Sequence, residues 1–127
     1  MTPELHAARA EQVLRALGKL TAQDHEMRIE AAMLAGTQLL NAGLHRLGIT
    51  EAHNDIVHAE YMGGPIRIKA DLLAPGLVDL LLQIEMLRPG HVRGDFAGGE
   101  QASEQALGLL AELQRRTRED GHGPGAR

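Results

Sequence analysis

Histidine is the residue type of this chain with the most chemical potential. The 127 residues include seven histidines and no cysteine, so a transition-metal site would need imidazole and carboxylate ligands. His53, Asp55 and His58 lie close together in a polar, glycine-containing stretch. The two histidines are five positions apart, whereas two ligands on one helical face need a spacing of four, so these residues could hold a metal only in a shaped loop. Our interpretation is therefore that they are polar loop residues, and that the chain has no cofactor.

The turn over residues 87–95 is the second group with functional chemistry. Arg88 and Arg93 place a guanidinium group on either side of His91. A guanidinium binds phosphate or carboxylate through paired hydrogen bonds, and a histidine can act as a general acid or base near neutral pH. These three are the candidate catalytic residues. The structural alternative is an arginine at a helix end, with Asp95 forming an ion pair inside the turn.

Other catalytic motifs are missing from the sequence. There is no glycine-rich phosphate loop of the Walker type. Ser103 is the single serine and lacks the Gly-x-Ser-x-Gly context of a nucleophile elbow. A di-iron site needs Glu-x-x-His on two helices, and the sequence does not carry this motif twice. We therefore expect a binding protein rather than an enzyme.

Composition limits the partners that the chain can bind. Lys and Arg total 13 against 17 Asp and Glu, a net charge of −4, which disfavours RNA and argues against DNA. Tyr61 and Phe96 are the only aromatic residues of their kinds and tryptophan is absent, so bases have almost nothing to stack on. No signal peptide and no membrane-spanning stretch is visible, and we expect a cytoplasmic protein with no membrane partner.

Four segments with apolar residues at helical spacing must position these groups. Pro3 and Pro75 stand in the first turns of the first and third segments, where a missing N–H costs nothing. Gly48 ends the second segment, the pair 89–90 ends the third, and Leu110 lies on the apolar stripe of the last. We expect helices over about residues 3–20, 22–47, 75–88 and 99–119.

The segment from Thr50 to Ala74 has no helical period and is expected to be irregular. A connection this long inside a compact domain is unusual and often functional. The alternative is that it covers an open edge of the helices with its apolar residues, Ile56, Val57, Ile66 and Ile68. Together these patterns predict an all-α fold: an up-and-down four-helix bundle over residues 1–120, with this irregular connection between helices two and three and a disordered tail, residues 121–127.

The chain resembles the HEPN superfamily of small helical bundles from prokaryotes. The resemblance rests on residues 31–36 and 44–49 of the second helix and on residues 87–94 before the last helix. It implies an up-and-down bundle, a homodimer, and either RNA cleavage or partnership with a nucleotidyltransferase in a toxin–antitoxin pair. Ribonuclease members carry an arginine and a histidine with a longer separation, whereas only two residues separate Arg88 from His91. The catalytic motif of the family is therefore not carried over.

Three functions remain open from the sequence. We expect a non-catalytic HEPN-like bundle that acts as a homodimer, through a partner or a small ligand. The alternatives are a ribonuclease that uses Arg88, His91 and Arg93, and a bundle that binds a metal or small molecule with residues 50–74. The second helix favours the dimer, because its apolar face is too broad for three other helices of a small bundle to cover.

Overall fold

The regular elements of this chain are all helical. The computed structural model describes residues 1–120, with no strand in that range, which confirms the all-α prediction. The predicted tail, residues 121–127, lies outside the described residues. The elements are α1 (Pro3–Leu17), α2 (His25–Arg46), the 3-10 helix η1 (Ala59–Tyr61), α3 (Gly64–Leu73), α4 (Leu77–Glu85), the four-residue α5 (Arg88–His91) and α6 (Gly99–Asp120).

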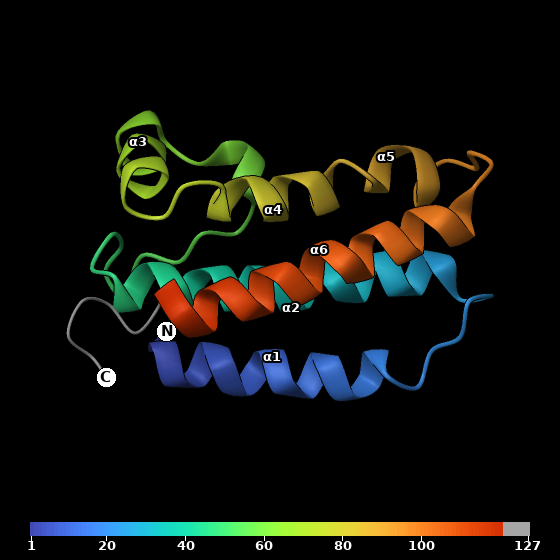
Figure 1. Ribbon diagram of the computed structural model, residues 1–127, viewed down its shortest axis with the longest axis horizontal. Helices are drawn as coiled ribbons and strands as arrows, with labels where there is room; N and C mark the ends of the chain where they lie inside the picture. Colours follow the sequence, from blue (N-terminus) through green and yellow to red (C-terminus); the bar gives the residue numbers. More distant parts are fainter. Residues whose placement is uncertain (121–127) are drawn as a thin grey trace.

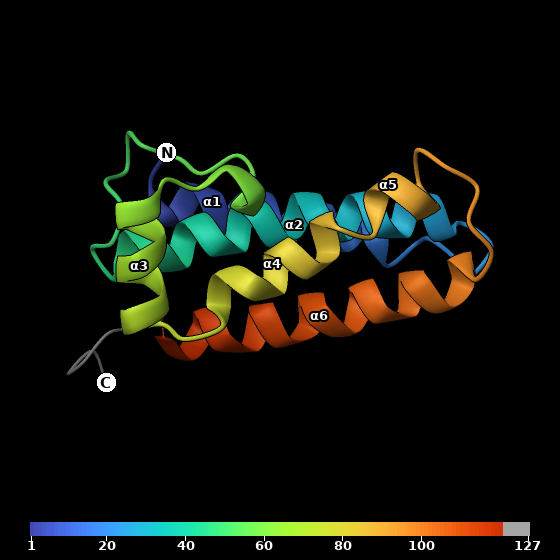
Figure 2. The same ribbon diagram turned by 90° about the horizontal axis from the view of Figure 1, so that it is seen from above.

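Four of the helices run alongside one another in alternating directions. Helix α2 contacts α1 on one side and α6 on another, and α4 packs on both α2 and α6 (Figures 1 and 2). Helix α3 lies across one end of this group and packs on α4. The predicted count of four helices is too low, because α3 is a fifth helix of more than two turns. None of the helices within residues 1–120 is long and apolar enough to cross a membrane.

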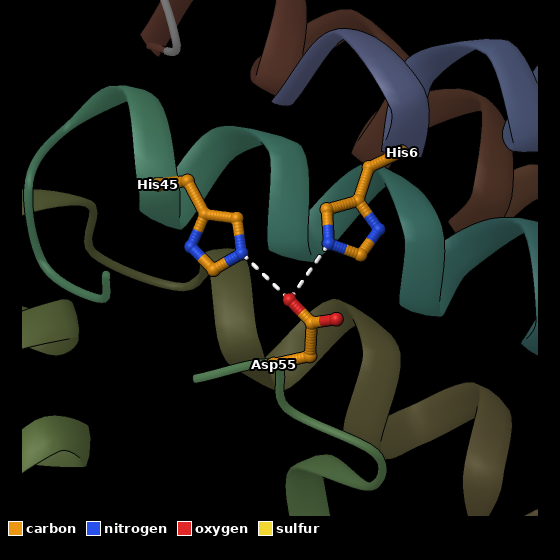
Figure 3. Close-up of side chains that lie close together, drawn as sticks. All are labelled: His6, His45 and Asp55. Carbon is orange, nitrogen blue, oxygen red and sulfur yellow. Dashed lines mark hydrogen bonds and ion pairs between the residues drawn. The ribbon is translucent and has the colours of Figure 1, made fainter. Parts of the chain in front are cut away.

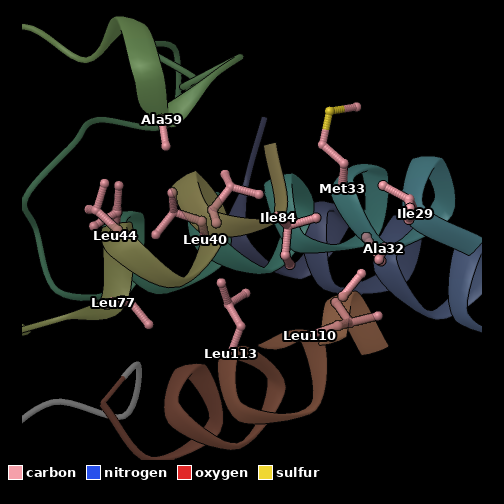
Figure 4. Packing of buried hydrophobic residues seen from close by; sticks show 14 of the residues in the cluster. Ile29, Ala32, Met33, Leu40, Leu44, Ala59, Leu77, Ile84, Leu110 and Leu113 are labelled. Carbon is pink, nitrogen blue, oxygen red and sulfur yellow. The ribbon is translucent and has the colours of Figure 1, made fainter. Parts of the chain in front are cut away.

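The core is aliphatic and lies around α2. Leu40 and Leu44 of α2, Leu81 of α4 and Leu113 of α6 are completely buried, and Figure 4 shows side chains of α2, α4 and α6 packed together in this cluster. Gly36 of α2 explains how α4 comes so close, because a Cβ atom there would lie 3.1 Å from Leu81 Cδ1. Burial of this many aliphatic side chains is the main favourable contribution to folding of the domain.

Side-chain hydrogen bonds stabilise the start of α1 and the turn between α1 and α2. The Thr2 hydroxyl accepts a hydrogen bond from the Leu5 N–H at 3.2 Å, which caps α1. The Asp24 carboxylate accepts one from the Thr21 N–H at 2.8 Å and so holds residues 21–24 in a turn. Helix α1 ends at Leu17 and α2 begins at His25, so both predicted helices extended too far into the connection between them.

The helix predicted over residues 75–88 is shorter in the structure, and a separate short helix, α5, follows it. Gly76 adopts a left-handed backbone with a φ angle of 81°, so α4 begins after it rather than at Pro75. Helix α4 ends at Glu85, and Pro89 occupies the first turn of α5 instead of ending a helix. Proline fits the first turn of a helix because it lacks the N–H that this turn leaves unpaired.

The predicted irregular connection over residues 50–74 contains helix α3, which corrects that part of the prediction. Pro65 stands in its first turn, as at the start of α1. Only Ala70 of this helix is buried, and Ile68 and Leu72 are 62% and 76% exposed. A short helix whose apolar residues do not share a buried face carries no periodic signal, so the pattern could not reveal it.

Candidate metal centre

Two histidines and one aspartate from separate parts of the chain meet beside the α1–α2 hairpin. His6 comes from the first turns of α1, His45 from the last turn of α2, and Asp55 from the connection before η1. The Nε2 atom of His6 lies 2.9 Å and that of His45 2.8 Å from the same carboxylate oxygen, Oδ1 of Asp55 (Figure 3). Atoms that could act as ligands from all three residues lie within 4.8 Å of one another.

The two imidazole rings are buried, and the carboxylate is the accessible member of the cluster. Only 3% of the His6 side chain and 2% of the His45 side chain are exposed, against 35% of Asp55. Burial of two polar rings is costly unless each ring nitrogen has a partner. The partners of the other two nitrogens therefore decide what the cluster can do.

Gln38 sets the orientation and the tautomer of His6. The Gln38 side-chain oxygen lies 2.7 Å from His6 Nδ1, and an amide oxygen only accepts hydrogen bonds. With Gln38 oriented in this way, Nδ1 carries a proton, and Nε2 faces Asp55 either with a proton of its own, in the positively charged ring, or with a lone pair, in the neutral ring. A lone pair facing a carboxylate oxygen needs a cation between them, either a proton or a metal ion. Histidines that bind metals show this arrangement, in which the second ring nitrogen donates to an oxygen.

Thr50 fixes the orientation of the His45 ring, although its hydroxyl can donate or accept and so does not set the tautomer. Its hydroxyl oxygen lies 2.6 Å from His45 Nδ1, and Thr50 is itself buried. Both rings are thus held from behind by a polar side chain, with Nε2 directed at Asp55 (Figure 3). Such fixed rings lose little conformational freedom when they bind a metal ion.

Asn41 holds the backbone next to Asp55 against α2. Its side-chain oxygen accepts a hydrogen bond from the Ile56 N–H, and its amide nitrogen donates to the Ile56 carbonyl, both at 2.7 Å. The same nitrogen also donates to the Thr37 carbonyl at 2.9 Å. Asn41 is only 2% exposed. This buried amide therefore fixes the position of an otherwise non-helical segment that carries the carboxylate.

Replacing Asn41 by alanine should lower the free energy of unfolding by about 1–3 kcal/mol, because the Ile56 backbone groups lose their partners. Urea denaturation of the metal-free protein measures this loss. Gln105→Ala is the matched control, since Gln105 is exposed on α6, and its effect should stay within about 0.5 kcal/mol. Equal stabilities of the Asn41→Ala variant and the wild type would contradict this role.

The Asp55 carboxyl remains ionised to low pH. Burial raises its pKa, but hydrogen bonds from His45 and His6, the positive charge of protonated His6 and the Met1 amino group together outweigh burial. The net result lowers the pKa from 3.8 to about 2. The carboxylate is therefore charged, and available as a ligand, at any physiological pH.

Stability should depend on Asp55 in acid. Because the pKa is lower in the folded than in the unfolded chain, ionised Asp55 stabilises the fold above pH 4, and this contribution disappears as the pH falls from about 4 to about 2. Solvent screening of a carboxyl that is about one-third exposed leaves roughly 1 kcal/mol of the effect. The stability difference between wild type and Asp55→Asn, measured by urea denaturation without metal, should shrink over this pH range. A constant difference would contradict the assignment.

Of the three residues that the sequence offers as metal ligands, the structure brings only Asp55 into the cluster. His53 is 80% exposed and lies 3.2 Å from Glu51. His58 points instead toward Glu85, with 3.6 Å between its Nδ1 atom and the carboxylate. The Glu85 carboxylate also accepts hydrogen bonds from the backbone N–H groups that begin η1, so this contact belongs to the packing of η1 on α4.

The candidate catalytic residues of the second group do not share one pocket. Arg88 forms an ion pair with Glu30 of α2. The His91 ring packs edge-on against Phe96, with 5.8 Å between the ring centroids, whereas Arg93 is exposed. Arg88 and Arg93 line a pocket of about 200 Å³ that His91 does not line. The structure therefore gives His91 no direct access to a ligand held between the two arginines.

Sequence reasoning missed His6 and His45 as candidate ligands. His6 and Asp55 are 49 positions apart and His45 and Asp55 are 10 apart, so no local spacing connects them. The one available signal was that His6 and His45 lie on two predicted helices. This signal becomes informative only when it is known that these two helices pack against each other. The chain matches no protein-family model, no curated protein and no solved structure.

Proposed function

We propose that this protein binds a divalent transition-metal ion through His6 Nε2, His45 Nε2 and the Asp55 carboxylate. Imidazole ligands suit Zn²⁺, Fe²⁺, Ni²⁺ and Cu²⁺, and a carboxylate completes the kind of site that binds Zn²⁺ or non-haem iron. The observation that carries the proposal is the orientation of His6, whose Nδ1 faces the Gln38 oxygen while Nε2 faces a second acceptor. A metal ion in the middle satisfies all of these atoms at once.

Three protein ligands leave part of the coordination sphere of the metal free. A structural zinc site has four protein ligands, whereas a catalytic or ligand-binding site keeps a position for water or another small molecule. His6 and Asp55 both line a pocket of about 540 Å³, a size typical of small-molecule sites. The function that this arrangement supports is metal-dependent binding of a small molecule. It differs from the third function that the sequence leaves open, because Asp55 is the one ligand from residues 50–74.

Metal titration of the intact chain tests the proposal directly. Isothermal titration with Zn²⁺ should give one site per chain, and Co²⁺ should give the visible absorption of a protein-bound ion. A metal at a hundredfold excess over its dissociation constant should also stabilise the fold by about 2.7 kcal/mol, which EDTA reverses. Because the Met1 amino group lies 3.4 Å from both Asp55 oxygens, a purification tag belongs at the other end. Absence of saturable binding would refute the proposal.

The homodimer is a second proposal, and an apolar groove between α1 and α2 favours it. Met27 and Leu34 of α2 are 59% and 51% exposed at this groove. The other apolar residues that line it are Val13, Ala16, Leu17, Leu20 and Ala31. A second copy of the chain, presenting the same face, would remove these side chains from water. The HEPN resemblance, a nucleotidyltransferase partner and a ribonuclease activity stay predictions.

If this groove is the dimer interface, Met27→Glu should convert a dimer to a monomer, because two buried carboxylates would face each other across the axis. Light scattering after size exclusion should give about twice the chain mass for the wild type and about one chain mass for the variant. Leu72→Glu on α3 is the control, since Leu72 is 76% exposed and lies outside the groove. A monomeric wild type would end the dimer proposal.

A further inference from the structure

The pocket beside the candidate metal centre is a long groove that follows α2. Its floor consists of α2 residues that recur every three or four positions, so they form one stripe along the helix: Glu30, Met33, Leu34, Thr37, Gln38 and Asn41. Glu30 and Asn41 are eleven positions apart, which corresponds to about 16 Å along the helix. His6 and Asp55 lie at the Asn41 end of the groove, and Arg88 lies at the Glu30 end. The groove is therefore much longer than a single metal-bound water requires.

The middle of the groove is largely apolar, with the Gln38 amide as a polar group beside it. Thr37 donates its hydroxyl proton to the Met33 carbonyl at 2.8 Å, and Asn41 is occupied with the Ile56 backbone, so these polar floor residues have no free donor. Met33 and Ile56 contribute aliphatic surface. Val57 lines the groove from the side of the connection and is 69% exposed, although valine normally prefers burial.

The two ends of the groove differ in chemistry. At one end, the free coordination positions of the metal would accept a ligand with oxygen or nitrogen atoms. At the other end, the Arg88–Glu30 ion pair joins α5 to α2 and bounds the groove with charged groups. An occupant must therefore have a polar head, an apolar body, and a length that ends before this ion pair.

We infer that the ligand of this site is a small amphiphilic molecule, whose polar head binds the metal and whose unbranched apolar chain lies along α2 between Met33, Ile56 and Val57. This inference rests on the metal site proposed above. The head supplies the ligand atoms that complete the coordination sphere, and the chain removes the exposed aliphatic surface of the groove from water.

Alkyl hydroxamates of increasing chain length are the probes for this inference, because the head group chelates metals and only the chain varies. Affinities of acetohydroxamate, butyrohydroxamate and octanohydroxamate are measured by titration against protein loaded with Co²⁺. Each methylene group that becomes buried should raise the affinity about fourfold, so octanohydroxamate should bind at least roughly 100-fold more tightly than acetohydroxamate. The gain per methylene should vanish for chains long enough to reach Arg88.

A substitution in the groove distinguishes the contribution of the apolar chain to the affinity from that of the polar head. Val57→Glu should lower the affinity for octanohydroxamate by at least about tenfold and leave acetohydroxamate binding unchanged, because only the chain contacts residue 57. Val57 is exposed, so the variant should fold normally. Leu72→Glu, another exposed aliphatic position but outside the groove, should change neither affinity.

The outcomes distinguish this inference from the proposed metal site. Failure to bind Co²⁺ refutes the metal site itself. Co²⁺ binding together with equal affinities for the three hydroxamates refutes the amphiphile and leaves the metal site intact. A chain-length dependence that is the same in metal-free protein, or that Val57→Glu does not reduce, shows binding elsewhere and also overturns the inference.

Discussion

Replacing His45 by alanine should lower the affinity for Zn²⁺ by more than about 100-fold. Loss of a residue that merely orients a ligand costs 10-fold to 100-fold, and loss of the ligand itself should cost more. The His45 Nε2 atom lies 2.8 Å from Asp55 Oδ1, and no other histidine of the described residues is near enough to substitute. Isothermal titration at neutral pH measures the effect, with His6→Ala and Asp55→Asn expected to behave alike.

The controls for this prediction come from the same chain. His53→Ala removes a histidine that is 80% exposed and outside the cluster, and it should leave the affinity for Zn²⁺ unchanged. Gln38→Ala removes the acceptor behind His6 without removing a ligand, so the affinity should fall about 10-fold to 100-fold. If His45→Ala lost stability but no metal affinity, the cluster would be a hydrogen-bonded structural element instead.

The second large effect is expected in the core. Leu110→Ala should lower the free energy of unfolding by about 2–5 kcal/mol, because it removes buried methyl groups and leaves a cavity. Leu110 of α6 is 3% exposed, and its Cδ1 atom lies near Gly36 of α2, which has no side chain of its own to fill the space. Urea denaturation followed by circular dichroism gives the value, provided that metal is absent from every sample.

Leu72→Ala is the matched control for this substitution. It makes the same chemical change at a leucine that is 76% exposed, so the stability should change by no more than about 0.5 kcal/mol. A Leu110→Ala variant as stable as the wild type would mean that α6 does not pack on α2 in the way described. That result would also remove the physical basis for the position of the other core residues.

The helices were largely predictable because their signals are local. Thr2 followed by Pro3 marks the start of α1, and the apolar stripe that includes Leu110 marks α6, all within a few turns of chain. The errors have local causes too. Gly76 delays the start of the predicted third helix through its left-handed backbone, and α3 was invisible because its aliphatic residues, such as Leu72, face outward.

The candidate site was not predictable in the same way. Sequence proximity associated Asp55 with His53 and His58, yet these histidines point elsewhere. Asp55 instead meets His6 and His45, which the chain places on two different helices.

The sequence by itself determined that this protein is helical, aliphatic in its core and without thiolate chemistry, since periodicity and composition depend on neighbouring residues alone. Only the tertiary structure decided which side chains form a site. Packing of α1 on α2 brings His6 beside His45, and the Asn41 side chain fastens the Ile56 backbone so that Asp55 reaches both. These are contacts between residues far apart in the chain, and no spacing rule encodes them.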